Sequence, residues 1–393
     1  MPATRARTAV ALVFALNGFA FASWASRVPE VRTALDLSPG ALGLLLLSIA
    51  AGSVLSLPAS GPLVHRVGAA RVVAGAAVVD GGGLALAGAG VAAGEVALTA
   101  GGLFLLGVGS GSWDVAMNVE GAAVERELAR SIMPRFHAAW SLGTVAGAGL
   151  GAVAAALSVP VAAHLLGAAL VAGLLPAALV RSFLPAAAEA DPGDVPRPRR
   201  GAMRAWTEPR TLVIGVMVLA MAFTEGTAND WLAVALVDGY GVGPAVGASG
   251  FAVFVTAMTA GRLVGPALLD RFGRLAVLRG SMLLAGVGVL VVVFGEWLPL
   301  VALGTVVWGV GASLGFPVGM SAAADDPEHA AARVAVVSTI GYTAFLAGPP
   351  LIGFLADSVG TLSSLLVVAV LIVPSVLAVG AARPLPVAAR DDG

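Results

Sequence analysis

Four acidic side chains lie inside long apolar stretches of this sequence, where a charged group is costly to place. They are Asp80, Asp114, Glu225 and Asp230. A carboxylate at the centre of a bilayer costs at least ~2.5–3.5 kcal/mol on insertion scales, so such residues face the protein interior or a water-filled space. A carboxyl group held there can exchange a proton or bind a polar solute. These acids are therefore the first candidates for chemistry.

Asp114 has a polar neighbour at helical spacing. Asn118 follows it by four residues, so the two side chains share one helix face. Gly107 and Gly111 lie on roughly the same face, where a solute or a neighbouring helix can approach the backbone closely. Two interpretations stay open at this point: Asp114 carries protons along a transport path, or it forms a structural hydrogen bond between helices.

A second acidic pattern lies in the second half of the chain. Glu225 and Asn229 repeat the spacing of four, and Asp230 lies on the adjacent face. We expect Glu225 near mid-depth and Asp230 toward one membrane interface. Trp231 fits either a site residue or an interfacial belt residue. Asp80 precedes three glycines, and we expect it to have a structural or gating role.

A polar stripe runs along another expected helix. His137, Trp140, Ser141 and Thr144 fall at helical spacing. Histidine titrates near neutral pH and could share a proton with Asp114. The flat indole of Trp140 suits a sugar ring or an aromatic solute. The alternatives are a solvated histidine near a helix end and a packing tryptophan.

Composition places these residues in a membrane protein. Of 393 residues, 58% are hydrophobic and 11% are charged, against about 25% charged in soluble domains. Apolar runs of about twenty residues, the length that crosses a bilayer, recur along the chain. The net charge of -1 gives no indication of nucleic acid binding. The chain has no cysteine, which excludes disulfides and thiolate metal sites.

The apolar runs predict an all-α membrane protein with twelve transmembrane helices. The first six are expected near 8–28, 39–63, 70–91, 97–119, 132–156 and 160–182, and the second six near 210–236, 244–268, 274–294, 298–321, 332–355 and 360–381. The first run follows Arg5 and Arg7 and resembles a signal peptide. We expect it to remain as the first helix, because it has a counterpart in the second half.

The predicted helices form two pseudo-symmetric six-helix bundles, 1–182 and 210–393, joined by a cytoplasmic linker at 183–209. The linker is rich in proline, glycine and charge. If both termini are cytoplasmic, only Arg27 and Arg32 lie in outer loops, which satisfies the positive-inside rule. Arg262 falls inside the eighth helix, and we expect it to reach the cytoplasmic surface or to pair with Asp270.

A short repeat supports two related halves. Gly-Pro, Arg and Gly recur at offsets of 204 to 205: Gly61-Pro62, Arg66 and Gly68 match Gly265-Pro266, Arg271 and Gly273. Parallel repeats of this kind build transporters whose halves rock about a site at the midplane. The two loops are expected to act as gates, their charged residues meeting helix ends or neighbouring carboxylates. Those residues are Arg66, Arg71, Asp270, Arg271 and Arg274.

The second loop resembles the signature of the major facilitator superfamily, Gly-x-Leu-x-Asp-Arg-x-Gly-Arg-Arg. Gly265, Asp270, Arg271, Gly273 and Arg274 match it, whereas the first copy has His65 at the position of the aspartate. The resemblance extends over the whole chain at the level of topology. It implies the major facilitator fold, with a cavity lined by the first helix of each half. On the first helix, Asn17 and Trp24 are the polar and aromatic candidates.

Within that superfamily the chain is most similar to the fucose-permease-like sugar:proton symporters. The sequence from Asp114 to Asn118 resembles their acidic residue four positions before an asparagine. That resemblance implies that Asp114 is the proton-linked carboxylate and that His137 and Trp140 occupy substrate-facing positions. The symporters carry a second acid on the first helix, but Trp24-Ala25-Ser26 stands in that region here. Coupling therefore rests on fewer groups, or the substrate is not a sugar.

These observations predict a monomeric secondary transporter of the bacterial inner membrane. No nucleotide loop, catalytic triad or metal-ligand cluster is found, so we expect no enzyme activity, cofactor, metal or nucleic acid partner. The expected partners are a small-molecule substrate, protons and the lipid bilayer. The favoured function is proton-coupled symport of a small polar, sugar-like solute. The alternatives are an efflux carrier for drugs or metabolites and a non-transporting sensor or scaffold.

Overall fold

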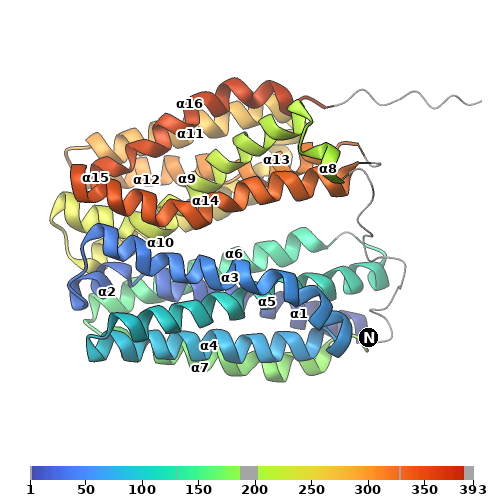
Figure 1. Cartoon of the computed structure of the whole chain (residues 1–393), viewed down its shortest axis with the longest axis horizontal. Helices are drawn as coiled ribbons and strands as arrows, with labels where there is room; N and C mark the ends of the chain where they lie inside the picture. Colours follow the sequence, from blue (N-terminus) through green and yellow to red (C-terminus); the bar gives the residue numbers. More distant parts are fainter. Residues whose placement is uncertain (1, 131, 186–201, 327–328, 385–393) are drawn as a thin grey trace, which may run out of the picture. The chain divides into compact units, whose positions relative to one another are not determined.

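The described residues form long helices, and short turns join most of the consecutive ones (Figure 1). The computed structural model describes residues 2–130, 132–185, 202–326 and 329–384, and within them it contains no strand. The first half contains α1 (Pro2–Ala25), α2 (Val28–Ala34), α3 (Pro39–Val67), α4 (Ala69–Ala93), α5 (Val96–Leu128), α6 (Met133–Ala156), α7 (Val161–Leu179) and η1 (Val180–Ser182). The second half contains α8 (Ala202–Ala205), α9 (Pro209–Tyr240), α10 (Pro244–Phe272), α11 (Arg274–Phe294), α12 (Leu298–Ala312), α13 (Gly315–Ala323), α14 (Ala330–Val359), α15 (Thr361–Ser364), α16 (Leu366–Ala378) and η3 (Val379–Ala382).

Twelve segments of these helices are long and apolar enough to cross a membrane, which confirms the predicted fold class and number of spans. The tenth span is divided into α12 and α13, and the twelfth into α15, α16 and η3. α5 continues to Leu128, nine residues beyond the predicted end. The prediction stopped short because the last turns of α5 are polar and give no apolar run. An apolar run therefore measures the length of helix in lipid and not the end of the helix. Most of the predicted linker, 186–201, lies outside the described residues.

The repeated glycines make the turns between consecutive helices. Gly68 has φ +85° and joins α3 to α4, and Gly273 has φ +76° and joins α10 to α11. L-residues rarely adopt this conformation. The Gly-Pro pairs of the same repeat lie inside α3 and α10, and not in the turns themselves. The sequence thus predicted the position of both turns, although each preceding helix is longer than expected.

The helices belong to two compact units. Unit 1 contains the described residues of the first half together with Thr227–Thr259 and Leu346–Leu365, and unit 2 contains the other described segments of the second half. Within unit 1, glycines allow helix backbones to touch. A Cβ atom on Gly143 of α6 would lie 1.9 Å from the carbonyl oxygen of Ala15 on α1, and one on Gly18 would lie 2.3 Å from that of Trp140. This close packing sets the polar residues of α1 beside those of α6.

The turn at Gly273 can be tested by substitution. We expect Gly273→Ala to destabilise the purified protein by about 1–3 kcal/mol, the range for a residue forced into such a conformation. Open space surrounds Gly273, so the cost is one of backbone conformation and not of a clash. Gly280→Ala, within α11 and also in open space, is the control and should be neutral or stabilising. Equal melting temperatures of the two variants in detergent would contradict the assignment.

Candidate functional site

Asp114 lies on α5 with an amide as its partner. Asn118 donates from Nδ2 to the Asp114 carboxylate oxygen Oδ1 over 3.2 Å and to the Asp114 carbonyl oxygen over 2.8 Å. Among the residues that the structure describes, no arginine forms an ion pair with Asp114. The predicted pairing of Asp114 and Asn118 on one face is present. A neutral amide orients the carboxylate but leaves its charge uncompensated.

The side chain of Asp114 is exposed, and the surroundings of α5 show which face it occupies. Leu105 lies nine residues earlier, half-way around the helix, and it is one of the exposed apolar residues expected to meet lipid. Gly107 and Gly111 pack against α3: a Cβ atom on Gly107 would lie 2.0 Å from the carbonyl oxygen of Ile49. These glycines therefore admit a neighbouring helix. Asp114 is exposed on the side of α5 away from Leu105.

Asn17 and Trp140 are brought together across α1 and α6. The indole Nε1 of Trp140 donates to Asn17 Oδ1 over 2.9 Å, and the ring stacks on Phe21 at 6.4 Å between centroids. The hydrogen bond fixes the orientation of the indole ring. His137, one turn away, is exposed and meets the edge of Phe14 at 5.4 Å. Asn17, Trp140 and His137 thus form one polar and aromatic strip within unit 1.

Two tryptophans and two acids from the sequence analysis are buried or partly buried. Trp24 is 1% exposed, and Asp80 is buried where α4 packs on α5, with its backbone nitrogen 2.4 Å from a Cβ atom built on Gly109. Trp231 is fully buried, so it is not an interfacial belt residue. Asp230 is half-buried on α9. Asp80 thus lies between packed backbones, and its structural or gating role stays a prediction.

Glu225 has a cation as its partner, which distinguishes it from Asp114. Arg262 Nη2 contacts the two carboxylate oxygens of Glu225 over 2.9 and 3.0 Å, and its Nε donates to the carbonyl oxygen of Ser313 over 3.4 Å. The two side chains are 12% and 26% exposed. The expectation that Arg262 reaches the surface or pairs with Asp270 was therefore wrong. Asp270 is exposed, and pairing with the shielded Glu225 neutralises two charges inside the bundle.

The expected gate residues contact different partners in the two repeats. In unit 2, Arg274 contacts Asp325 over 2.7 and 2.8 Å, and Arg210 contacts the same carboxylate over 2.9 Å. In unit 1, Arg71 donates to the carbonyl oxygen of Val67 at the end of α3. Both kinds of partner, a helix end and a carboxylate, were expected. Asp325 itself was missed because it lies just after α13, outside the apolar run and the repeat.

The other gate residues of the repeat do not share these partners. The guanidinium of Arg271 lies over the ring of Phe272, at 5.2 Å from its centroid. Arg66 lies in the last turn of α3 and Asp270 near the end of α10. Both residues are exposed. Their roles in gating stay predictions.

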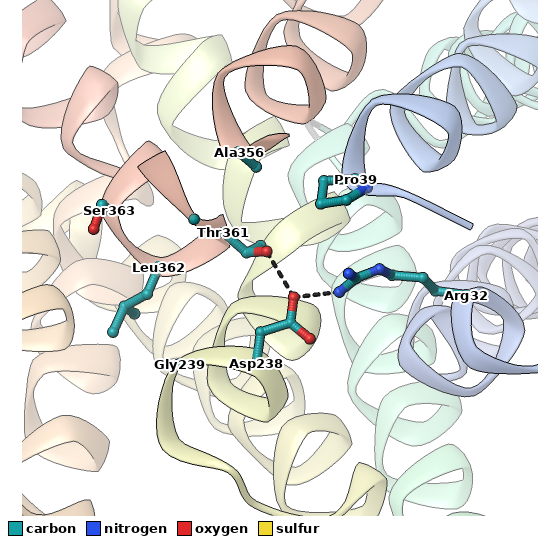
Figure 2. Close-up of a pocket in the computed structure, with 9 residues that line it drawn as sticks. Arg32, Pro39, Asp238, Gly239, Ala356, Thr361, Leu362 and Ser363 are labelled. Carbon is teal, nitrogen blue, oxygen red and sulfur yellow. Dashed lines mark hydrogen bonds and ion pairs between the residues drawn. The ribbon is translucent and has the colours of Figure 1, made fainter. Parts of the chain in front are cut away.

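An ion pair in unit 1 joins residues that are far apart in sequence (Figure 2). Arg32 of α2 pairs with Asp238 Oδ2 of α9, and the same carboxylate oxygen accepts a hydrogen bond from Thr361 Oγ1 of α15 over 2.6 Å. These residues border an open recess of about 340 Å³ that Pro39 and Ala356 also line. One feature of the sequence indicated this site: Arg32 is one of the two arginines expected in outer loops, which are otherwise poor in basic residues.

The comparison with protein families settles the class of the protein. The model described as Major Facilitator Superfamily matches residues 10–274 and 216–392. The chain belongs to the Major Facilitator Superfamily. It is therefore a multi-pass membrane protein of a family of secondary transporters, and the resemblance read from the second loop is confirmed.

Relatives of this superfamily member span nearly its whole length. An uncharacterized transporter, y4wD, of Sinorhizobium fredii is 36% identical over 89% of this chain and 90% of its own length. An uncharacterized MFS-type transporter of Yersinia pestis is 31% identical, over 91% and 90%. The membrane protein MosC of Rhizobium meliloti is 28% identical, over 90% and 84%.

Solved structures share the superfamily fold at low sequence identity. The nucleoside transporter NupG has a TM-score of 0.75 at 14% identity, covering 95% of this chain and 97% of that one. The fucose:proton symporter FucP of E. coli has a TM-score of 0.63 at 14% identity, covering 95% and 98%. At these identities the likeness shows the fold alone.

The Glu225–Arg262 pair gives a prediction about stability. Arg262→Gln leaves the carboxylate without its cation, and we expect a loss of about 2–3 kcal/mol, below the ~3–5 kcal/mol of a fully buried pair. Removing both charges in Glu225→Gln/Arg262→Gln should recover much of that loss. The measurement is thermal unfolding in detergent, with the exposed Arg279→Gln as the control. A double variant no more stable than Arg262→Gln would show that the pair is not the cause.

Proposed function

We propose that this superfamily member is a proton-coupled symporter of a small polar solute in the bacterial inner membrane, with both termini cytoplasmic. The solute crosses by alternating access between the two six-helix bundles, 1–182 and 210–393. The strip of half-buried Trp140, exposed His137 and buried Asn17 supports a solute that offers both a ring face and hydrogen-bonding groups. The names of NupG and FucP, a nucleoside transporter and a fucose:proton symporter, agree with a polar solute.

The observation that carries this proposal is the contrast between two acids. Glu225 is neutralised by Arg262, whereas Asp114 has only the amide of Asn118. An uncompensated carboxylate in a membrane-spanning helix needs water, a cation or a proton. Since Asp114 is exposed, a proton can reach it from the transport path. Asp114 therefore carries the coupled proton, and Glu225 remains an ion pair.

The proton gradient supplies enough free energy for accumulation. One charge that moves through 100 mV yields ~2.3 kcal/mol. At ~1.4 kcal/mol for each tenfold change in concentration, that corresponds to about fifty-fold accumulation. A single proton-carrying acid is therefore sufficient for a useful gradient of a neutral solute.

The alternative function, efflux of drugs or metabolites, uses the same acid in the opposite sense. In that case a proton from outside binds Asp114, and binding of the solute from the cytoplasm releases this proton to the inside. Solute and proton then cross the membrane in opposite directions. Flux in proteoliposomes with an imposed pH gradient of either sign distinguishes the two, because symport and antiport accumulate solute under opposite gradients.

The role of Asp114 can be tested once the solute is found by a thermostability screen of sugars, nucleosides, amino acids and drugs. In proteoliposomes we expect Asp114→Asn to abolish uptake driven by a pH gradient while solute exchange continues. Glu127→Gln removes a charge from the exposed end of the same helix and should accumulate solute as the parent does. If Asp114→Asn accumulates solute to the parental level, the assignment of the coupled proton to Asp114 is refuted.

A further inference from the structure

The helices α4 and α11 are counterparts in the repeat, but α11 is one turn shorter. α4 follows the turn at Gly68 and has 25 residues, whereas α11 follows the turn at Gly273 and has 21. At 1.5 Å per residue α11 is ~32 Å long, close to the ~30 Å of hydrocarbon in a bilayer. Charged Arg271 and Arg274 hold its first residues at one surface. The turn after α11, 295–297, therefore lies among the lipid headgroups of the other surface.

The end of α11 borders an apolar recess that faces lipid. The recess has a volume of about 320 Å³ and lies between α11 and the first turn of α12. Val287, Leu290 and Phe294 form its α11 side, and all three side chains are exposed. Leu300 lines it from α12. Apolar side chains exposed on a membrane-spanning helix meet lipid, so an acyl chain is the group that this recess suits.

Close contact between the two helices closes the recess toward the centre of the membrane. A Cβ atom on Gly304 of α12 would lie 2.7 Å from Val291 Cγ1 of α11. One on Gly288 of α11 would lie 2.3 Å from the backbone nitrogen of Trp308 of α12. The two helices thus touch at depth, and the recess opens toward the turn that joins them.

Two side chains of that turn can contact a lipid headgroup. Glu296 and Trp297 are both exposed. Within the described part of the chain, no arginine or histidine forms an ion pair with Glu296. Indoles favour the headgroup region, where the ring is in apolar surroundings and the N–H group can donate a hydrogen bond. The turn carries one acid and no base, so it attracts a cationic headgroup and repels an anionic one.

We propose that this recess binds one phospholipid with a primary amine headgroup, phosphatidylethanolamine. One acyl chain lies in the recess against Leu290 and Phe294. The ammonium group of the lipid pairs with Glu296, and the indole of Trp297 donates to a phosphate or ester oxygen. The inference needs only that the chain spans a bilayer, which its membership of the superfamily shows. It does not depend on the solute or on the direction of transport.

Native mass spectrometry of the purified full-length protein tests the headgroup contact. Dioleoyl phosphatidylethanolamine and dioleoyl phosphatidylglycerol are added in equal amounts to the protein in detergent, and the first bound lipid is identified. We expect the parent to prefer the ethanolamine lipid. Glu296→Gln should lower that preference by about two- to five-fold, the range for an exposed charge pair.

The matched control for the headgroup contact is Glu95→Gln, which removes the exposed acid of the turn between α4 and α5. There the two helices touch beside the turn, since a Cβ atom on Gly90 would lie 2.5 Å from the backbone nitrogen of Thr99. Glu95→Gln should therefore keep the parental preference. The proposal is refuted if the parent prefers the glycerol lipid, or if the two glutamine variants give the same preference.

The acyl-chain contact is tested by filling the recess. Val287→Trp places an indole at its wall and should remove the preferred binding of the ethanolamine lipid. Leu283→Trp, one turn earlier on the same helix, is also exposed but lies outside the recess, and it should bind as the parent does. Equal binding by the two tryptophan variants would contradict the proposal. So would a dimeric parent that Val287→Trp makes monomeric, because a second copy of the chain would then occupy the recess. If a tryptophan variant does not fold, the comparison of Glu296→Gln with Glu95→Gln decides.

Discussion

A charge inside a bilayer must be neutralised, and this constraint orders the charged residues of the protein. Glu225, in the middle of α9, is neutralised by Arg262. Asp114, in α5, has the amide of Asn118 as its partner instead of a cation. We assign the proton to this acid and not to Glu225.

Packing imposes the second constraint, because helices that carry few interlocking side chains must touch through their backbones. Gly143 and Gly18 bring α1 against α6 and so place Asn17 within hydrogen-bonding distance of Trp140. Gly43 brings α3 against α14. In the first case a hydrogen bond between side chains fixes the contact. In the second, Arg32 pairs with Asp238 beside the start of α3. Backbone contact through glycine is thus found in unit 1 together with polar contacts between helices.

Much of the fold could be predicted from the sequence, for physical reasons that particular residues illustrate. Apolar runs of about twenty residues have the length of a membrane span, and the predicted number of twelve spans was confirmed. Gly68 and Gly273 lie, with positive φ, in the turns at which the repeat placed the loops. Polar helix ends were missed, because the last turns of α5 carry no apolar signal. The partners of charged side chains were harder to predict. Arg262 lies eight residues from Asp270 but bonds to Glu225, 37 residues away, and no local sequence pattern determines that choice.

The central claim is that Asp114 gains and loses a proton while Glu225 stays an ion pair, and infrared titration of the purified protein in lipid tests it most directly. A protonated carboxyl group has a carbonyl stretching band that a carboxylate lacks. The account predicts that one component of this band grows as the pH is lowered, that Asp114→Asn removes this component, and that Glu225→Gln leaves it in place. A component that survives in Asp114→Asn and disappears in Glu225→Gln would contradict the account.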